Sequence, residues 1–345
     1  MGYWLAYTLI LVVGLTLGIG ALIEIRRYWK SSSFLRQLVE NILLTLLAIF
    51  LTFMGAEFFF KEFFAQTDSF DFTLASQNWF ERYWITNSMG YRDIEWSQAD
   101  VQGKRKILVV GDSFAAGFGI ENVEDRFSNV LGHKLGSDYV VMNMASPGVS
   151  TQQEIERIGG FPYKPDIVIW QYYINDIRQA AERKNAIFDL PKKDPWPIFQ
   201  PLVNNSYALN FIYWRAVRLG PQTWEGAYLP WLKGTFNDPD IWWLHQQELL
   251  TIAEGAASEK VKLIVVVFPA LSNVKESKEI TLKVLALFEE RGVPVLDVAK
   301  LVEDVPPEQL VVNSLDAHPN EWVHQQVAGK LYELVVHLEQ RTETH

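Results

Sequence analysis

Two long apolar stretches open the chain and differ from everything after them. Residues 1–23 contain no charged side chain, and residues 41–56 form a second charge-free run that apolar neighbours extend to spanning length. At about 1.5 Å per residue, a helix of this length crosses a hydrocarbon core of about 30 Å. The pattern therefore predicts a hairpin of two transmembrane helices over residues 1–60.

Basic residues between the two runs predict the orientation of this hairpin. Arg26, Arg27, Lys30 and Arg36 lie in or beside the connecting loop. By the positive-inside rule, the loop is cytoplasmic, and everything after residue 60 is extracytoplasmic (periplasmic) at the plasma (inner) membrane. A cleaved signal peptide is the alternative, but no basic residue precedes the first run and a second run follows it.

Beyond residue 104, short β-rich runs alternate with helical patterns. Near-continuous Val, Ile and Leu is typical of strands that are covered on both faces. Helical spacing of apolar residues occurs over residues 123–135, after a candidate Asn122 cap, and over residues 323–338. The alternation predicts a three-layer α/β/α fold around a mostly parallel five-stranded sheet. The expected strands are residues 106–110, 139–143, 166–171, 261–268 and 293–298.

Two segments fall outside this alternation. Residues 61–104 are aromatic and polar without clean periodicity, and we interpret them as a connector to an α/β domain over residues 105–345. Residues 177–260 greatly exceed the dozen or so residues that a parallel crossover needs, and they hold six of the thirteen tryptophans. This insertion could be an apolar lid, a carbohydrate-stacking surface or a segment at the membrane interface, where Trp and Tyr are favoured.

Composition and charge exclude several classes of protein. The chain of 345 residues is 49% hydrophobic and 14% aromatic, which is too apolar for a disordered protein. Residues 1–60 carry four basic and three acidic groups, so the remainder carries 27 basic and 38 acidic groups, a net charge of −11. Such an acidic domain is a poor partner for nucleic acid. There is no cysteine, and no HExxH, Walker or GxGxxG pattern indicates a metal or another cofactor.

Loops at the carboxyl ends of the expected strands carry the groups that acyl transfer needs. In an open parallel sheet, ligands bind outside these ends. Ser113 could act as a nucleophile if His318 takes its proton, and Asp316 could orient the imidazole and stabilise its cation. The backbone N–H groups of Ser113 and Gly148 and the side-chain amide of Asn175 could form an oxyanion hole.

At these loops the sequence resembles the SGNH (GDSL-type) hydrolases and acyltransferases, over roughly residues 85–340. The resemblance implies a flavodoxin-like α/β/α fold. It also implies that Ser113 is the nucleophile, His318 the base and Asp316 its partner, with Gly148 and Asn175 as oxyanion donors. The matching stretches, in order, are VVGDSFAAGFG, NMASPG, QYYINDI and DAHPN.

Two positions depart from the usual pattern of this superfamily. Tyr173 stands where a glycine commonly precedes the asparagine, which would narrow the pocket. Asp316 and His318 are two residues apart and not the usual three, a spacing that some membrane-associated polysaccharide acetyltransferase relatives show. Upstream, the stretch NSMGYRD resembles a segment that precedes the serine block in one membrane-anchored bacterial branch. Its Arg92 and Asp93 could touch substrate or form a structural ion pair.

These features predict a membrane-anchored serine esterase or O-acyltransferase. An acyl group on Ser113 would pass to water or to a sugar hydroxyl. The anchor favours O-acylated, especially O-acetylated, envelope glycan as the substrate. The resemblance also implies a multi-spanning membrane acyltransferase as a partner. A lipid esterase or lysophospholipase is one alternative, and a non-catalytic scaffold of an envelope assembly is another.

Overall fold

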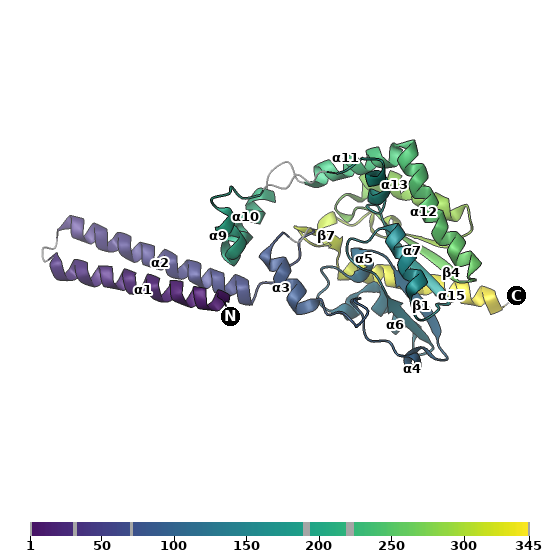
Figure 1. Cartoon of the computed structure of the whole chain (residues 1–345), viewed down its shortest axis with the longest axis horizontal. Helices are drawn as coiled ribbons and strands as arrows, with labels where there is room; N and C mark the ends of the chain where they lie inside the picture. Colours follow the sequence, from purple (N-terminus) through teal and green to yellow (C-terminus); the bar gives the residue numbers. More distant parts are fainter. Residues whose placement is uncertain (1, 30–32, 70–71, 189–193, 219–223, 344–345) are drawn as a thin grey trace. The chain divides into compact units, whose positions relative to one another are not determined.

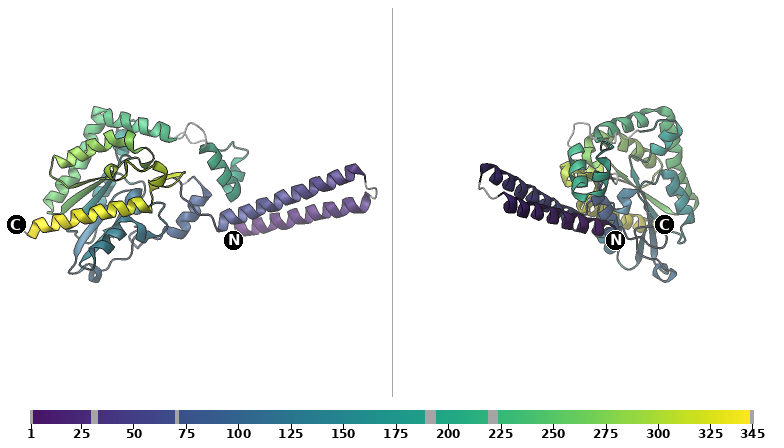
Figure 2. Two further views of the ribbon diagram at one scale, coloured as in Figure 1. Left: turned by 180° about the vertical axis from the view of Figure 1, so that it is seen from behind. Right: turned by 60° about the vertical axis from the view of Figure 1, so that its left-hand side comes forward.

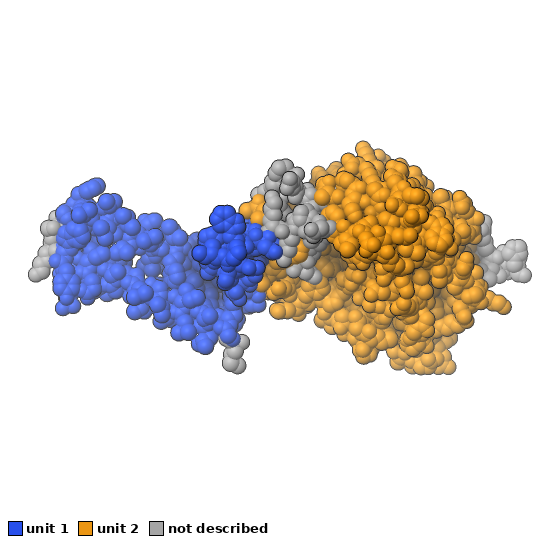
Figure 3. Space-filling view, turned by 45° about the horizontal axis from the view of Figure 1, so that its top comes forward, with its two compact units in different colours: residues 1–65, 194–214 blue, residues 66–193, 215–345 orange. Residues whose placement is uncertain are grey.

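Two compact units make up the chain (Figure 3). Unit 1 consists of residues 1–65 and 194–214, and unit 2 consists of residues 66–193 and 215–345. Unit 1 therefore includes part of the insertion, and unit 2 includes most of the predicted connector, residues 61–104. The computed structural model describes residues 2–29, 33–69, 72–188, 194–218 and 224–343 (Figure 1).

Two long apolar helices form most of unit 1. α1 spans Gly2–Tyr28 and α2 spans Phe34–Glu62, and both are long and apolar enough to cross a membrane. They run antiparallel to each other (Figure 1). A Cβ on Gly14 would lie 2.4 Å from the ring of Phe50, so the glycine makes room for an aromatic side chain of α2. Small residues at such contacts are common between membrane helices. The two apolar helices that the sequence predicts are present.

Short helices from the insertion complete unit 1. α9 spans Gln200–Asn205, and α10 begins within unit 1 and spans Tyr207–Arg218. Near the end of α2, the carboxylate of Glu57 accepts hydrogen bonds from the Ser206 hydroxyl (2.8 Å) and from two backbone N–H groups in the first turn of α10 (2.9 Å each). A negative charge stabilises a helix at its N-terminus, so the Glu57 carboxylate holds the N-terminus of α10 against α2.

A five-stranded sheet forms the centre of unit 2. Its strand order is β2-β1-β3-β4-β5 and every neighbouring pair is parallel, which is the flavodoxin-like arrangement that the sequence predicts. The five predicted strands are confirmed, with ends displaced by two residues at most. They are β1 (Arg105–Val110), β2 (Tyr139–Asn143), β3 (Ile167–Tyr173), β4 (Lys262–Phe268) and β5 (Val295–Asp297).

Helices cover both faces of this sheet and give three layers (Figure 2). Ile169 of β3 enters one buried cluster, whereas its neighbours Val168 and Trp170 enter the other, because successive side chains of a strand point to opposite faces. Both faces are apolar for this reason. The main covering helices are α6 (Phe127–Leu135) and α15 (Glu321–Glu343) on one face, and α7 (Thr151–Gly160), α12 (Pro239–Ser258) and α13 (Val274–Glu289) on the other.

Local elements differ from the sequence-based expectation at two places. Asn122 caps a short 3₁₀ turn and not the long helix, because Arg126 is extended (φ −68°, ψ 141°) and α6 begins after it. Before residue 105, where no periodicity is visible in the sequence, short helices are present. The smaller helices of unit 2 are α3 (Leu74–Tyr83), α4 (Gln98–Val101), α5 (Ser113–Ala116), α8 (Arg178–Arg183), α11 (Trp224–Asn237) and α14 (Ala299–Val302).

Candidate active site

Ser113 is the first residue of α5, directly after β1. β1 lies between β2 and β3, at the point where the strand order reverses and where such sheets bind ligands. The turn is held by side chains on both sides. Asp112 accepts a hydrogen bond from the Phe114 N–H (2.9 Å), and Gln171 Oε1 accepts from the N–H groups of Asp112 and Ala115 (3.1 Å each). These bonds fix the nucleophile candidate against β3.

Gly111 allows this turn to approach β3 closely. A Cβ at this position would lie 2.3 Å from Gln171 Oε1 and 3.0 Å from the Cβ of Ala115. Since Gln171 Oε1 is the acceptor that holds the turn, any side chain at position 111 would displace it. The glycine before Asp112 is therefore required by packing.

Ser113, His318 and Asp316 form one hydrogen-bonded chain. His318 Nε2 lies 2.8 Å from Ser113 Oγ, and His318 Nδ1 lies 2.5 Å from Asp316 Oδ1. All three residues are buried. A base within hydrogen-bonding distance of the nucleophile, and a carboxylate that orients the base, are the two contacts that activate a serine hydroxyl.

A short β-hairpin explains the two-residue spacing between Asp316 and His318. β6 (Val311–Asn313) pairs antiparallel with β7 (Asp316–Pro319), at a place where the sequence predicts a loop. Alternate residues of a strand project to the same side. The strand therefore carries the carboxylate and the imidazole on one face, and the shorter spacing still permits their contact.

Side chains from residues 66–69 hold the buried Asp316. The Thr67 hydroxyl donates to Asp316 Oδ2, and the Ser69 hydroxyl oxygen accepts from the Ala317 N–H (3.0 Å). Burial by itself would raise the pKa of Asp316, but the charge of His318 and the hydrogen bonds from His318 and Thr67 outweigh it and lower this pKa. Neither Thr67 nor Ser69 is identified from the sequence, because no motif or periodicity marks this segment.

A pocket of about 370 Å³ opens beside Ser113 and His318. Gly148, in a left-handed conformation (φ 71°), and Asn175 both line it. Among the described residues, the Asn175 side chain has no hydrogen-bond partner, so its amide is available to a ligand. The N–H of Ser113 lies in the first turn of α5 and has no acceptor within that helix. The three residues that are expected to supply oxyanion donors, Ser113, Gly148 and Asn175, thus line one pocket.

Aromatic side chains form the walls of this pocket. Tyr173 lines it at the position where the resemblance leads us to expect glycine. Phe118 also lines it and stacks on the ring of His318, with 4.3 Å between ring centroids. Phe188 and Tyr228 come from the insertion, with 4.9 Å between their ring centroids. The part of the insertion that belongs to unit 2 therefore contributes one wall.

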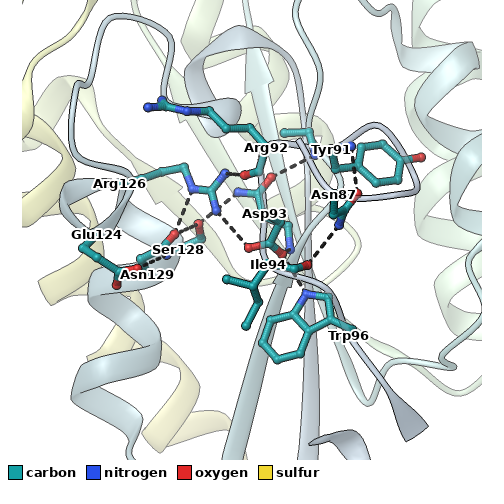
Figure 4. Close-up of polar contacts among 12 residues, drawn as sticks. Asn87, Tyr91, Arg92, Asp93, Ile94, Trp96, Glu124, Arg126, Ser128 and Asn129 are labelled. Carbon is teal, nitrogen blue, oxygen red and sulfur yellow. Dashed lines mark hydrogen bonds and ion pairs between the residues drawn. The ribbon is translucent and has the colours of Figure 1, made fainter. Parts of the chain in front are cut away.

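Arg92 and Asp93 lie in a buried polar network and do not line the pocket (Figure 4). Asp93 pairs with Arg126 (3.3 Å) and not with Arg92, and Arg126 also donates to the Arg92 carbonyl (2.5 Å). The Arg92 guanidinium donates to the carbonyl groups of Gly117 (2.5 Å) and Ile120 (2.6 Å), in the loop after α5. Of the two roles open from the sequence, the contacts favour the structural one.

The same network reaches Asn143, the last residue of β2. Asp93 Oδ2 accepts from the Asn143 N–H (2.8 Å) and from Trp96 Nε1 (2.9 Å; Figure 4). The Asn143 amide in turn donates to the carbonyl of Ala115 (2.9 Å). The segment before β1 thus contacts both the loop that follows α5 and the last residue of β2.

A buried carboxyl group, Glu154 in α7, also belongs to unit 2. Burial raises its pKa to about 8, and the negative charge of Asp112 adds to this rise, although Trp170 Nε1 donates a hydrogen bond to the carboxyl (2.6 Å). Within the described ranges, no group of three or more His, Asp or Glu side chains could hold a metal ion.

Comparisons with known proteins give structural matches alone. No protein-family model and no curated protein matches the sequence. The solved structure of TesA is 17% identical, with a TM-score of 0.42, covering 66% of this chain and 97% of that one. A lipase/acylhydrolase from Enterococcus faecalis is 16% identical, with a TM-score of 0.42 and coverage of 67% and 95%. Est24, a carbohydrate acetylesterase from Sinorhizobium meliloti, is 14% identical, with a TM-score of 0.37 and coverage of 68% and 100%.

Other matching structures are described as members of the lipolytic G-D-S-L family, among them one from Veillonella parvula (16% identity, TM-score 0.40, 66% of this chain and 97% of that one). This chain is thus similar to GDSL-type lipolytic hydrolases, the superfamily that its four sequence blocks resemble.

Proposed function

We propose that this chain is a membrane-anchored serine esterase or O-acyltransferase that works through an acyl-Ser113 intermediate. The observation that carries the proposal is the hydrogen-bonded chain from Ser113 Oγ through His318 to Asp316, at 2.8 and 2.5 Å. It lies beside a pocket that is also lined by Gly148 and Asn175. The serine nucleophile, the histidine base and the carboxylate are thus already in the contacts through which acyl transfer to a serine proceeds.

The reaction follows from the positions of these side chains. Ser113 Oγ attacks the ester carbonyl carbon while His318 Nε2 takes its proton. The negative charge that develops on the carbonyl oxygen is stabilised by the N–H groups of Ser113 and Gly148 and by the Asn175 amide. The carbon–oxygen bond to the leaving alcohol breaks, and His318 gives the proton to that oxygen.

A second attack releases the acyl group. Water or a sugar hydroxyl attacks the acyl-Ser113 carbonyl, His318 takes the proton of the attacking oxygen, and the proton passes to Ser113 Oγ as the ester bond breaks. Asp316 stays ionised throughout, because its pKa is lowered, and it stabilises the imidazolium at each stage. Whether water or a hydroxyl acts second separates the esterase from the transferase.

We propose O-acetylated envelope glycan as the substrate. The pocket of about 370 Å³ is near the small end of ligand sites, which suits a short acyl group. Phe188 and Tyr228 offer aromatic faces to the group that carries the ester. The two apolar helices would hold the enzyme at the plasma (inner) membrane, with unit 2 on the periplasmic side.

Hydrolysis of nitrophenyl esters by the purified full-length protein tests this function. Acetyl, butyryl and palmitoyl esters are compared for the wild type, Ser113→Ala and the surface variant Ser137→Ala. We expect turnover of the acetyl ester that is lost in Ser113→Ala and kept in Ser137→Ala. Turnover that rises with chain length would favour the lipid esterase. Activity that survives Ser113→Ala would refute the acyl-serine mechanism.

A further inference from the structure

A charge-free segment from the middle of the chain stands out in unit 1. Residues 195–214 contain no Asp, Glu, Lys, Arg or His, although the surrounding insertion is rich in charges. Membrane-surface helices favour Trp and Tyr at the level of the headgroups. Six of these twenty residues are aromatic: Trp196, Phe199, Tyr207, Phe211, Tyr213 and Trp214.

Large apolar side chains of this segment are exposed on unit 1. Trp196 and Ile198 are each 76% exposed, and Leu202 is 56% exposed, all in or just before α9. Ile212 of α10 is 59% exposed. Large apolar side chains that are exposed together in one short segment point to contact with a membrane or a partner.

Contacts fix this segment to one end of the helical hairpin. Glu57 of α2 caps α10, and the Tyr3 hydroxyl of α1 donates to the same carboxylate (2.6 Å). Lys61 Nζ donates a hydrogen bond to the Tyr207 hydroxyl (2.9 Å), and the ring centroids of Phe60 and Phe211 lie 4.1 Å apart. α10 is therefore bound where α1 begins and α2 ends, which is the level at which both apolar helices would leave the membrane.

We infer that residues 195–214 lie on the lipid surface and form an interfacial part of the membrane anchor. The inference rests on the proposed membrane insertion of α1 and α2. The exposed apolar side chains of the segment add to the apolar exterior of those two helices, in whose 18-residue apolar windows only 6% and 11% of the residues are buried. The bilayer that surrounds α1 and α2 would also reach this segment, and Trp and Tyr are favoured at its surface. A protein partner would instead need a separate apolar surface that fits the segment.

Fluorescent labels at single cysteines test this placement, since the chain has no native cysteine. Ile198→Cys and Leu202→Cys report on the segment, Val13→Cys on the middle of α1, and Lys134→Cys on water-exposed unit 2. Each full-length variant is labelled with an environment-sensitive nitrobenzoxadiazole dye in nanodiscs that hold one copy. Lipids with nitroxide quenchers near the headgroup or deep in the acyl chain then give the depth of each label.

We expect labels at positions 198 and 202 to show blue-shifted emission and to be quenched most by the shallow nitroxide. The label at position 13 should be quenched most by the deep nitroxide, and the label at position 134 by neither. Water-like emission at 198 and 202 with deep quenching at 13 would overturn the inference and leave the anchor intact. Blue-shifted emission without lipid quenching would also overturn it, in favour of a protein contact. Absence of quenching at position 13 would refute the membrane insertion itself.

Discussion

Thr67→Val removes one hydroxyl group from the environment of Asp316 and leaves the side-chain volume almost unchanged. Thr67 and Asp316 are both 1% exposed, so water cannot replace the lost donor. Among the described residues, Thr67 is the donor to Asp316 Oδ2, whereas Oδ1 receives the two bonds from His318. The substitution therefore leaves one oxygen of a buried carboxylate without a partner.

The expected magnitude follows from the charge on the acceptor. Hydrogen bonds to charged groups contribute about 1.5–3 kcal/mol, so we expect the free energy of unfolding at pH 7 to fall by about 2 kcal/mol. A misplaced carboxylate also lets the His318 ring turn away from Ser113 Oγ. We expect kcat to fall between about tenfold and a hundredfold, because small misplacements of catalytic groups have effects of this size.

The loss of stability should also depend on pH. The Thr67 bond is one of the causes that lower the pKa of Asp316. A carboxyl group whose pKa is lowered by folding stabilises the protein above its unfolded pKa of about 3.9, and this stabilisation is lost as the pH falls through the folded pKa. The difference between wild type and Thr67→Val should therefore be largest at neutral pH and shrink below about pH 4.

Urea unfolding and steady-state ester hydrolysis of the full-length protein in detergent measure both effects. Thr67→Ser keeps the hydroxyl and serves as the matched control. We expect it to stay close to the wild type in stability and kcat. A Thr67→Val protein with wild-type kcat, or a Thr67→Ser protein as impaired as Thr67→Val, would refute the role of this hydroxyl.

Three further substitutions give distinct outcomes. Gly111→Ala should lower kcat about a hundredfold, because its Cβ would lie 2.3 Å from Gln171 Oε1, whereas Gly159→Ala, in open space on α7, should leave kcat unchanged. Glu154→Gln should flatten the pH dependence of the free energy of unfolding measured with urea. Because folding raises the pKa of Glu154 to about 8, the wild type loses stability as the pH rises from about 4.5 to 8. Parallel curves of unfolding free energy against pH for the wild type and the variant would contradict this. Gly14→Leu should abolish disulfide cross-linking between cysteines introduced across α1 and α2 in membranes, because even a Cβ would lie 2.4 Å from an aromatic ring of α2.

The sheet could be predicted from the sequence because each of its strands is buried on both faces. Runs such as KILVV and VKLIVVVF are then apolar throughout, and their ends are visible as changes of composition. The hairpin β6–β7 could not be predicted, because its strands have only three and four residues and contain polar residues. The division of the insertion between two units also has no local signal, since residues 206–208 contact the carboxylate of Glu57, which is distant in the sequence.

The candidate site was partly predictable for a similar reason. Ser113, Gly148 and Asn175 follow strands, and parallel strands bring their carboxyl ends to one edge of a sheet. Thr67 and the buried Glu154 could not be found, since Thr67 lies in a segment without periodicity and Glu154 is one of several charged or polar residues of its helix. Their contacts exist only once distant segments pack together.

Covalent labelling of Ser113 tests the central claim most directly. A fluorophosphonate reacts with an activated serine hydroxyl whether the enzyme is a hydrolase or a transferase. After trypsin, the labelled peptide should be residues 107–126, in which Ser113 is the only serine. We expect one label per chain on this peptide in the wild type, and none in Ser113→Ala or His318→Ala. A folded wild-type protein that stays unlabelled, or that is labelled elsewhere, would contradict the assignment of Ser113 as the nucleophile.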